Sequence, residues 1–131
     1  MATLKYSRQR ESIKDYLNST TEHPTADTVY LNVRKEFPNI SLGTVYRNLN
    51  LLAEIGDAIK IPTPNGGDRF DGRTIPHYHF CCTCCGRVMD LDIEQMDFIN
   101  ETAGKNFDGI IENHSMICLL YTSDAADDTP C

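Results

Sequence analysis

Three short amphipathic helices followed by two short strands constrain the fold of the first seventy residues. Each helix is predicted from a polar N-cap residue followed by apolar residues at helical spacing. The first follows Ser7 and stops at Asn18-Ser19-Thr20, and its apolar residues are Ile13, Tyr16 and Leu17. The second follows Thr25 and stops at Pro38, and its apolar residues are Val29, Val33 and Phe37. The third follows Ser41 and stops at Gly56, with an apolar side made by Leu42, Val45, Leu49, Leu52 and Ile55.

Two strands are expected next, at 58–61 and 69–71, joined by the turn-rich stretch 62–67. Three helices followed by a β-hairpin are the layout of a winged helix-turn-helix. The polar stretch Thr74-Ile75-Pro76 is a predicted hinge. Beyond it we expect strands at 77–82 and 87–91 around a Cys85-Gly86 turn, a helix from Ile93 to Ala103, and an interrupted strand from Phe107 to Ile117. The predicted fold class is α+β, with a winged helix-turn-helix at 1–73 and a small α/β domain at 77–117 that needs a metal or a partner chain for stability.

Length and charge limit the function. A chain of 131 residues suits one ordinary domain or two small ones, and it is too short for a large enzyme core. It has no signal-peptide pattern and no apolar run that could span a bilayer, so we expect a cytoplasmic protein. The net charge of −7 argues against nucleic acid, but residues 1–70 carry nine Lys/Arg against eight Asp/Glu, and residues 71–131 carry three against eleven. This division fits a first half that approaches phosphate and a second half that gathers cations.

Four of the six cysteines lie close together, at Cys81, Cys82, Cys84 and Cys85. Their position beside two histidines favours metal binding in a reducing compartment over a secreted disulfide scaffold. Cys82 and Cys85 form a Cys-x-x-Cys knuckle, in which two thiolates can bind one tetrahedral zinc. A redox site of the thioredoxin type is the alternative, but such a site would be followed by a helix, and a strand is predicted here.

Two further groups of polar residues have a functional and a plain explanation. On the third helix, Thr44, Tyr46, Arg47 and Asn50 lie opposite the apolar side, where an arginine can reach a guanine edge or a phosphate. A solvated helix face explains the same pattern. On the strand at 77–82, His77 and His79 share one face, as a metal-site precursor or as two exposed polar positions.

Several sequence motifs resemble the ferric uptake regulator family in their order and spacing, between about Ser7 and Ile117. They are Ser7-Arg8-Gln9-Arg10, His23-Pro24-Thr25-Ala26-Asp27, the stretch from Ser41 to Leu49, Arg69-Phe70-Asp71, and His77-Tyr78-His79 with Cys82-Thr83-Cys84-Cys85-Gly86. The resemblance implies a homodimeric transcriptional repressor, not an enzyme, which binds a palindromic double-stranded operator when loaded with metal. It assigns the third helix to the major groove and residues 77–117 to dimerisation.

Within the family the chain is most similar to the peroxide-sensing branch. This resemblance implies a regulatory ion held by His23, Asp71, His77, His79 and Asp90. Mixed imidazole and carboxylate ligands suit Fe(II) or Mn(II). Asp71 and Asp90 distinguish this branch from the iron-uptake branch, which tends to use glutamate. His114 aligns with a family histidine that helps to form a further metal site, and a surface histidine on a strand is the alternative.

The resemblance stops near Cys118. The family continues with a second Cys-x-x-Cys that completes the structural zinc site of Cys82 and Cys85, and this sequence lacks it. Residues 118–131 resemble a translated sequencing adapter, so we expect a non-native tail and an incomplete zinc site. The sequence thus favours a repressor that senses peroxide through bound Fe(II) or Mn(II). The nearest alternative is an iron-, zinc- or manganese-uptake repressor of the same family, and the others are a small Cys-x-x-Cys redox protein and a non-functional fragment.

Overall fold

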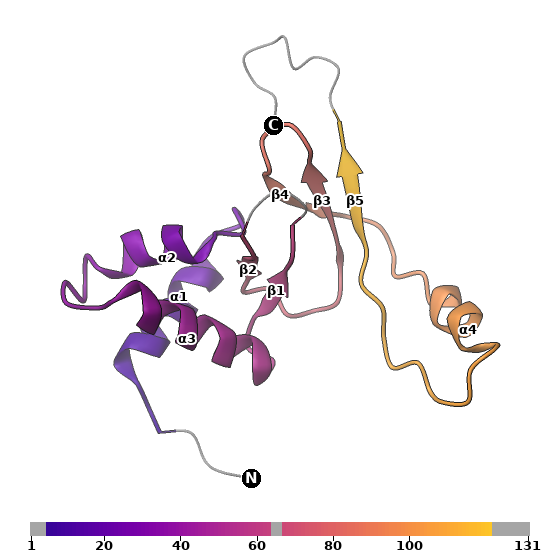
Figure 1. Ribbon diagram of the computed structural model, residues 1–131, viewed down its shortest axis with the longest axis horizontal. Helices are drawn as coiled ribbons and strands as arrows, with labels where there is room; N and C mark the ends of the chain where they lie inside the picture. Colours follow the sequence, from indigo (N-terminus) through magenta and orange to yellow (C-terminus); the bar gives the residue numbers. More distant parts are fainter. Residues whose placement is uncertain (1–4, 64–66, 122–131) are drawn as a thin grey trace. The chain divides into compact units, whose positions relative to one another are not determined.

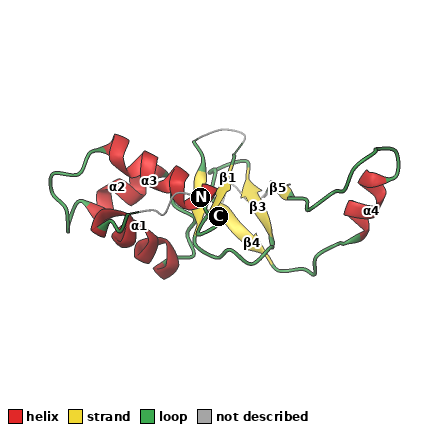
Figure 2. Cartoon of the chain, turned by 90° about the horizontal axis from the view of Figure 1, so that it is seen from below, coloured by secondary structure: helices red, strands yellow, loops and turns green. Residues whose placement is uncertain are grey.

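The computed structural model describes residues 5–63 and 67–121. The chain divides into two compact units, Met1–Thr74 and Ile75–Cys131, and both are drawn in Figure 1. The first unit contains the helices α1 (Arg8–Ser19), α2 (Ala26–Val33) and α3 (Leu42–Glu54) and the strands β1 (Ile59–Ile61) and β2 (Arg69–Asp71). The second contains the strands β3 (Tyr78–Cys82), β4 (Val88–Leu91) and β5 (Ile117–Leu120) and the helix α4 (Phe98–Gly104). Figure 2 distinguishes the helices from the strands by colour.

The three N-caps of the first unit are those that the sequence predicts. The hydroxyls of Ser7, Thr25 and Ser41 accept hydrogen bonds from backbone N–H groups in the first turns of α1, α2 and α3. The helices then bury one side each in a common core, which includes Ile13, Leu17, Val29, Val33, Val45, Leu49, Leu52 and Phe70. None of the helices in the described ranges is both long and apolar enough to cross a membrane.

Two expectations for these helices are wrong in detail. The second helix ends at Val33, before Pro38, and Phe37 follows a turn in which its N–H donates to the carbonyl of Val33 at 3.0 Å. Phe37 still packs against the core, which explains its place in the apolar pattern. In α3 the buried side is narrower than predicted, because Leu42 and Ile55 are 38% and 43% exposed. Both lie at the helix ends, where the chain leaves the core.

The strands β1 and β2 pair antiparallel, with Lys60 opposite Phe70, and form the predicted hairpin after α3. Gly56 ends the helix with a φ of 87°, a conformation that glycine adopts without strain. The predicted turn at 62–67 lies partly outside the described residues, which stop at 63 and resume at 67. Three capped helices followed by this hairpin confirm the winged helix-turn-helix architecture.

The second unit is a three-stranded sheet in the order β4-β3-β5 with one short helix. The antiparallel pair β3–β4 agrees with the prediction, and Gly86, at a φ of 76°, lies in the turn between them. Two other predictions are wrong. The helix begins at Phe98 instead of Ile93, and the last strand begins at Ile117 instead of Phe107 and runs parallel to β3. The expected start of the tail at 118 falls inside β5, and residues 122–131 of that tail lie outside the described residues.

Candidate metal and nucleic-acid sites

In the first unit, His23 and Asp71 form a buried pair. Nε2 of His23 lies 3.1 Å from Oδ2 of Asp71, and the two residues are 2% and 5% exposed. The sequence places them 48 residues apart, and strand β2 brings them together. An imidazole and a carboxylate at this separation are two potential metal ligands that already lie side by side.

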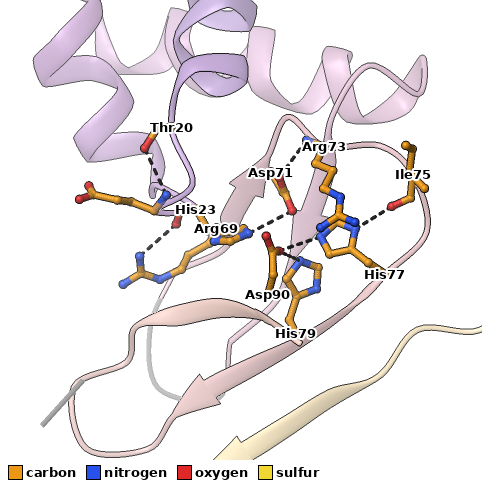
Figure 3. Close-up of polar contacts among 10 residues, drawn as sticks. Thr20, His23, Arg69, Asp71, Arg73, Ile75, His77, His79 and Asp90 are labelled. Carbon is orange, nitrogen blue, oxygen red and sulfur yellow. Dashed lines mark hydrogen bonds and ion pairs between the residues drawn. The ribbon is translucent and has the colours of Figure 1, made fainter. Parts of the chain in front are cut away.

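Hydrogen bonds to the backbone fix His23 in this position. Its φ is 53°, a left-handed conformation that is uncommon outside glycine. The guanidinium of Arg69 donates to the carbonyl of His23 at 3.0 Å, and the N–H of Phe70 donates to the carbonyl of Pro24 at 2.9 Å. Figure 3 shows the Arg69 contact beside the His23–Asp71 pair. The second strand of the wing thus holds both the histidine backbone and the aspartate that faces its ring.

In the second unit, His77, His79 and Asp90 form another group of potential ligands. Nε2 of His77 lies 2.9 Å from Oδ1 of Asp90, and Nε2 of His79 lies 3.6 Å from the same oxygen. The two rings are 4.4 Å apart between centroids, so they share one face as predicted. Asp90 is brought to them by the antiparallel register, in which it lies opposite His79.

The hydrogen bonds of His77 indicate that this group fits a cation. Its Nδ1 lies 2.6 Å from the carbonyl oxygen of Ile75, which can only accept, so Nδ1 carries a proton. In the neutral ring Nε2 then carries a lone pair, and it faces a carboxylate oxygen at 2.9 Å. Two acceptors at this distance attract each other only when a proton or a metal cation lies between them. An imidazole oriented through its other nitrogen is the usual arrangement of a histidine ligand.

Cys82 and Cys85 occupy the turn between β3 and β4. Cys82 is completely buried, and its backbone bonds to Gly86 and Arg87 close the knuckle. Cys85 is exposed and takes part in a disulfide bond. A zinc site at this knuckle requires Cys85 as a thiolate. The zinc site of Cys82 and Cys85 therefore stays a prediction.

His114 is held at both ring nitrogens. Nε2 lies 2.6 Å from the hydroxyl of Tyr78, and Nδ1 lies 2.8 Å from the amide oxygen of Asn100. The amide oxygen of Asn100 can only accept, so Nδ1 carries the proton and Nε2 accepts from the hydroxyl of Tyr78, whose oxygen also accepts from the N–H of Met96 at 2.8 Å. A metal at His114 would replace one of these bonds, and its role as a ligand stays a prediction. Sequence reasoning missed the role of Tyr78 as the partner of His114. Strand alternation could have indicated that Tyr78 lies on the face opposite His77 and His79.

The outer face of α3 carries the four residues predicted to contact nucleic acid. Tyr46, Arg47 and Asn50 are exposed and Thr44 is half-buried. The hydroxyl of Thr44 accepts from the hydroxyl of Ser41 at 2.9 Å and from the guanidinium of Arg47 at 3.0 Å. Arg47 is therefore oriented along the N-terminal turns of the helix, the part that usually meets base edges.

Comparison with known proteins identifies the family. The model of the ferric uptake regulator family matches residues 1–119. The chain belongs to this family. Its relatives include the peroxide-responsive repressor PerR of Staphylococcus epidermidis, which is 36% identical over 115 residues, or 88% of this chain and 77% of the relative. The resemblance to the family and the similarity to its peroxide-sensing branch, both inferred from the sequence motifs, are confirmed.

Solved structures of ferric uptake regulator proteins share the fold. The Campylobacter jejuni peroxide stress regulator superimposes with a TM-score of 0.75 at 32% identity, covering 87% of this chain and 85% of that one. The ferric uptake regulator Fur of Helicobacter pylori gives a TM-score of 0.79 over 95% of this chain and 84% of its own, and at 22% identity it shows the fold alone. The predicted class, a metal-dependent repressor of the Fur family, is confirmed. Repressors of this family are dimers that bind operator DNA.

Proposed function

We propose that this chain represses transcription in response to peroxide, and that one regulatory Fe(II) or Mn(II) is its sensor. The proposed ligands are His23 and Asp71 from the first unit and His77, His79 and Asp90 from the second. The observation that carries the proposal is the approach of His77 Nε2 to Asp90 Oδ1, because a cation satisfies two facing acceptors. The ligand types agree, since imidazole and carboxylate donors suit these ions better than zinc. The similarity to peroxide-responsive repressors supports peroxide as the stimulus.

One ion shared by both ligand groups would couple metal binding to DNA binding. His23 and Asp71 belong to the unit with the winged helix, and the other three ligands belong to the unit that we assign to dimerisation. The loaded state would hold the two units of each chain in one arrangement, and loss of a ligand would release it. When bound, iron supplies the electrons that reduce peroxide, and manganese does not. His23 and His77 are the proposed sites of the resulting oxidation.

The remaining assignments follow the same proposal. A homodimer places the α3 helix of each chain in a major groove of a palindromic operator, with Thr44, Tyr46, Arg47 and Asn50 toward the DNA. Reduced Cys82 and Cys85 contribute two thiolates to a structural zinc. The protein acts in the cytoplasm, where the thiols are reduced.

Loading the protein anaerobically with Fe(II) or Mn(II) tests the proposal. Both forms should bind an operator selected from relatives' promoters, and dilute peroxide should release only the iron form. Peptide mass spectrometry should then find one added oxygen on His23 or His77. Asp90→Asn should lower Mn(II) affinity by about ten- to a hundredfold, while Asp92→Asn, an exposed aspartate two residues away, should not. If the iron form keeps its operator and both histidines stay unmodified, the peroxide assignment is wrong and a metal-availability repressor takes its place.

A further inference from the structure

A lysine of the wing contacts the candidate DNA-binding face of α3. The ammonium of Lys60, on β1, donates to the side-chain amide oxygen of Asn50 at 3.0 Å. The same nitrogen lies 3.4 Å from a carboxylate oxygen of Asp68, just before β2. Lys60 lies outside all the motifs that the sequence analysis singled out. All three residues belong to the first unit, so the contact is internal to the winged helix.

This contact fixes which way round the Asn50 amide lies. A lysine ammonium has only hydrogen-bond donors, and of the two amide atoms only the oxygen accepts. The oxygen Oδ1 must therefore face Lys60, and the amide nitrogen, with its two protons, is turned away. Any N–H group of the Lys60 ammonium that does not bond to Asn50 or Asp68 is a further donor. The pair accordingly turns its N–H donors outward, while the positively charged ammonium lies at the one acceptor, Oδ1.

We infer that Lys60 sets Asn50 as a hydrogen-bond donor, so that Asn50 contacts guanine in the operator instead of adenine. The inference rests on the proposed function. Asparagine recognises adenine through two bonds at once, accepting from N6 with Oδ1 and donating to N7 with its nitrogen. Lys60 takes one of the two lone pairs of Oδ1, and its positive charge repels a second donor such as the N6 amino group of adenine, so the first bond is disfavoured. Guanine presents two acceptors, N7 and O6, at the same edge and matches the donors that the pair turns outward.

In this arrangement Asn50 is the specificity-determining residue and Lys60 is a positioning residue. Arg47 lies one turn earlier on the same side of the helix, and its guanidinium offers only donors. Asp68 opposes Lys60 with a negative charge and keeps its ammonium near the hairpin. The neighbouring positions of α3 therefore favour guanine acceptors over the mixed edge of adenine.

The test is a selection of binding sites from randomised DNA by the metal-loaded protein, with the wild type and its variants in parallel. Asn50→Ala should lose the preference at one base pair of each half-site. Lys60→Met keeps the aliphatic stem but frees the amide oxygen, so adenine should gain about tenfold over guanine at that base pair and at no other. Lys60→Arg retains donors and should keep the wild-type preference. Lys14→Met is the matched control, because Lys14 pairs with Asp57 at the same 3.4 Å and with similar exposure but does not touch Asn50.

The outcomes separate this inference from the proposed function. A wild-type protein that enriches no sequence would contradict the proposed function itself. Enrichment of a palindrome whose base preferences are the same in Lys60→Met and wild type would overturn the inference alone. A third result also overturns it: Asn50→Ala weakens all sequences equally and lowers the salt dependence, which would mean that Asn50 contacts a phosphate oxygen. A preference for adenine at the Asn50 position in the wild type would do the same.

Discussion

Replacing Gly72 with alanine should damage both the packing of the first unit and the His23–Asp71 pair. A Cβ at Gly72 would lie 2.7 Å from Oδ1 of Asn18 and 2.8 Å from the carbonyl carbon and oxygen of Leu17, whereas ordinary contacts begin at 3.4 Å. Two of these three atoms belong to the backbone of the last turn of α1, so they cannot move aside as a side chain would. The chain must shift by about half an ångström or more, and such overpacking costs about 1–3 kcal/mol.

The backbone shift caused by Gly72→Ala would also displace the proposed metal ligands. Asp71 precedes Gly72, and its Oδ1 accepts a hydrogen bond from the N–H of Arg73 at 2.8 Å. Displacing the backbone between them alters the direction in which the Asp71 carboxylate faces His23. We therefore expect weaker Mn(II) binding together with lower stability.

Urea unfolding followed by the circular dichroism of the helices measures the effect on stability. With a slope of about 1–3 kcal/mol per molar urea, the midpoint should fall by roughly 1 M. Gly67→Ala is the control, because a Cβ there meets nothing within 4 Å. Equal midpoints for Gly72→Ala and the wild type would refute the argument from close approach. A lower midpoint with unchanged Mn(II) affinity would separate the packing effect from the ligand geometry.

Three further changes test other contacts. Tyr78→Phe removes the acceptor of the Met96 N–H and the donor to His114 Nε2. It should lower the free energy of unfolding of the second unit by about 1–3 kcal/mol in thermal unfolding. Tyr121→Phe, at an exposed tyrosine, should leave this stability unchanged. Thr44→Val removes the acceptor that orients Arg47 and should weaken operator binding by about 0.5–1.5 kcal/mol, measured by fluorescence anisotropy; unchanged binding would show that Arg47 needs no such support. Burial, with a smaller contribution from Glu22, raises the pKa of Tyr16 above its ordinary 10.0. The folded state thus keeps the Tyr16 proton longer than the unfolded chain, so stability is lost as pH rises above 10, and Tyr16→Phe should reduce that loss in unfolding measured against pH.

Local signals predicted the first unit well because each helix start depends on residues three positions apart. Ser7, Thr25 and Ser41 cap the helices through their own hydroxyls, so the sequence alone contains the information. The strand alternation that placed His77 and His79 on one face is equally local. The pairs His23–Asp71 and His77–Asp90 were expected only from the family resemblance, since periodicity does not specify partners so far along the chain.

Contacts between residues of ordinary type were not predictable. Tyr78 and His114 are 36 residues apart, and nothing in either residue type specifies the other as its partner. Lys60 and Asn50 are only 10 residues apart, but their contact depends on how the chain turns between α3 and β1. Both contacts result from tertiary packing, which places side chains from different elements at bonding distance after the local structure has formed.

The errors in the second unit have a common physical cause. The apolar residues that predicted a strand from Phe107 and a longer helix near Phe98 are exposed in the single chain, at 74% and 60%, and Ile110 is 91% exposed. Helix α4 buries none of its residues. An apolar pattern records that side chains are buried in the functional state, not which chain buries them. Since these residues find no cover in the described part of the chain, a second copy that packs against this unit accounts for their chemistry, as the homodimer that we propose requires.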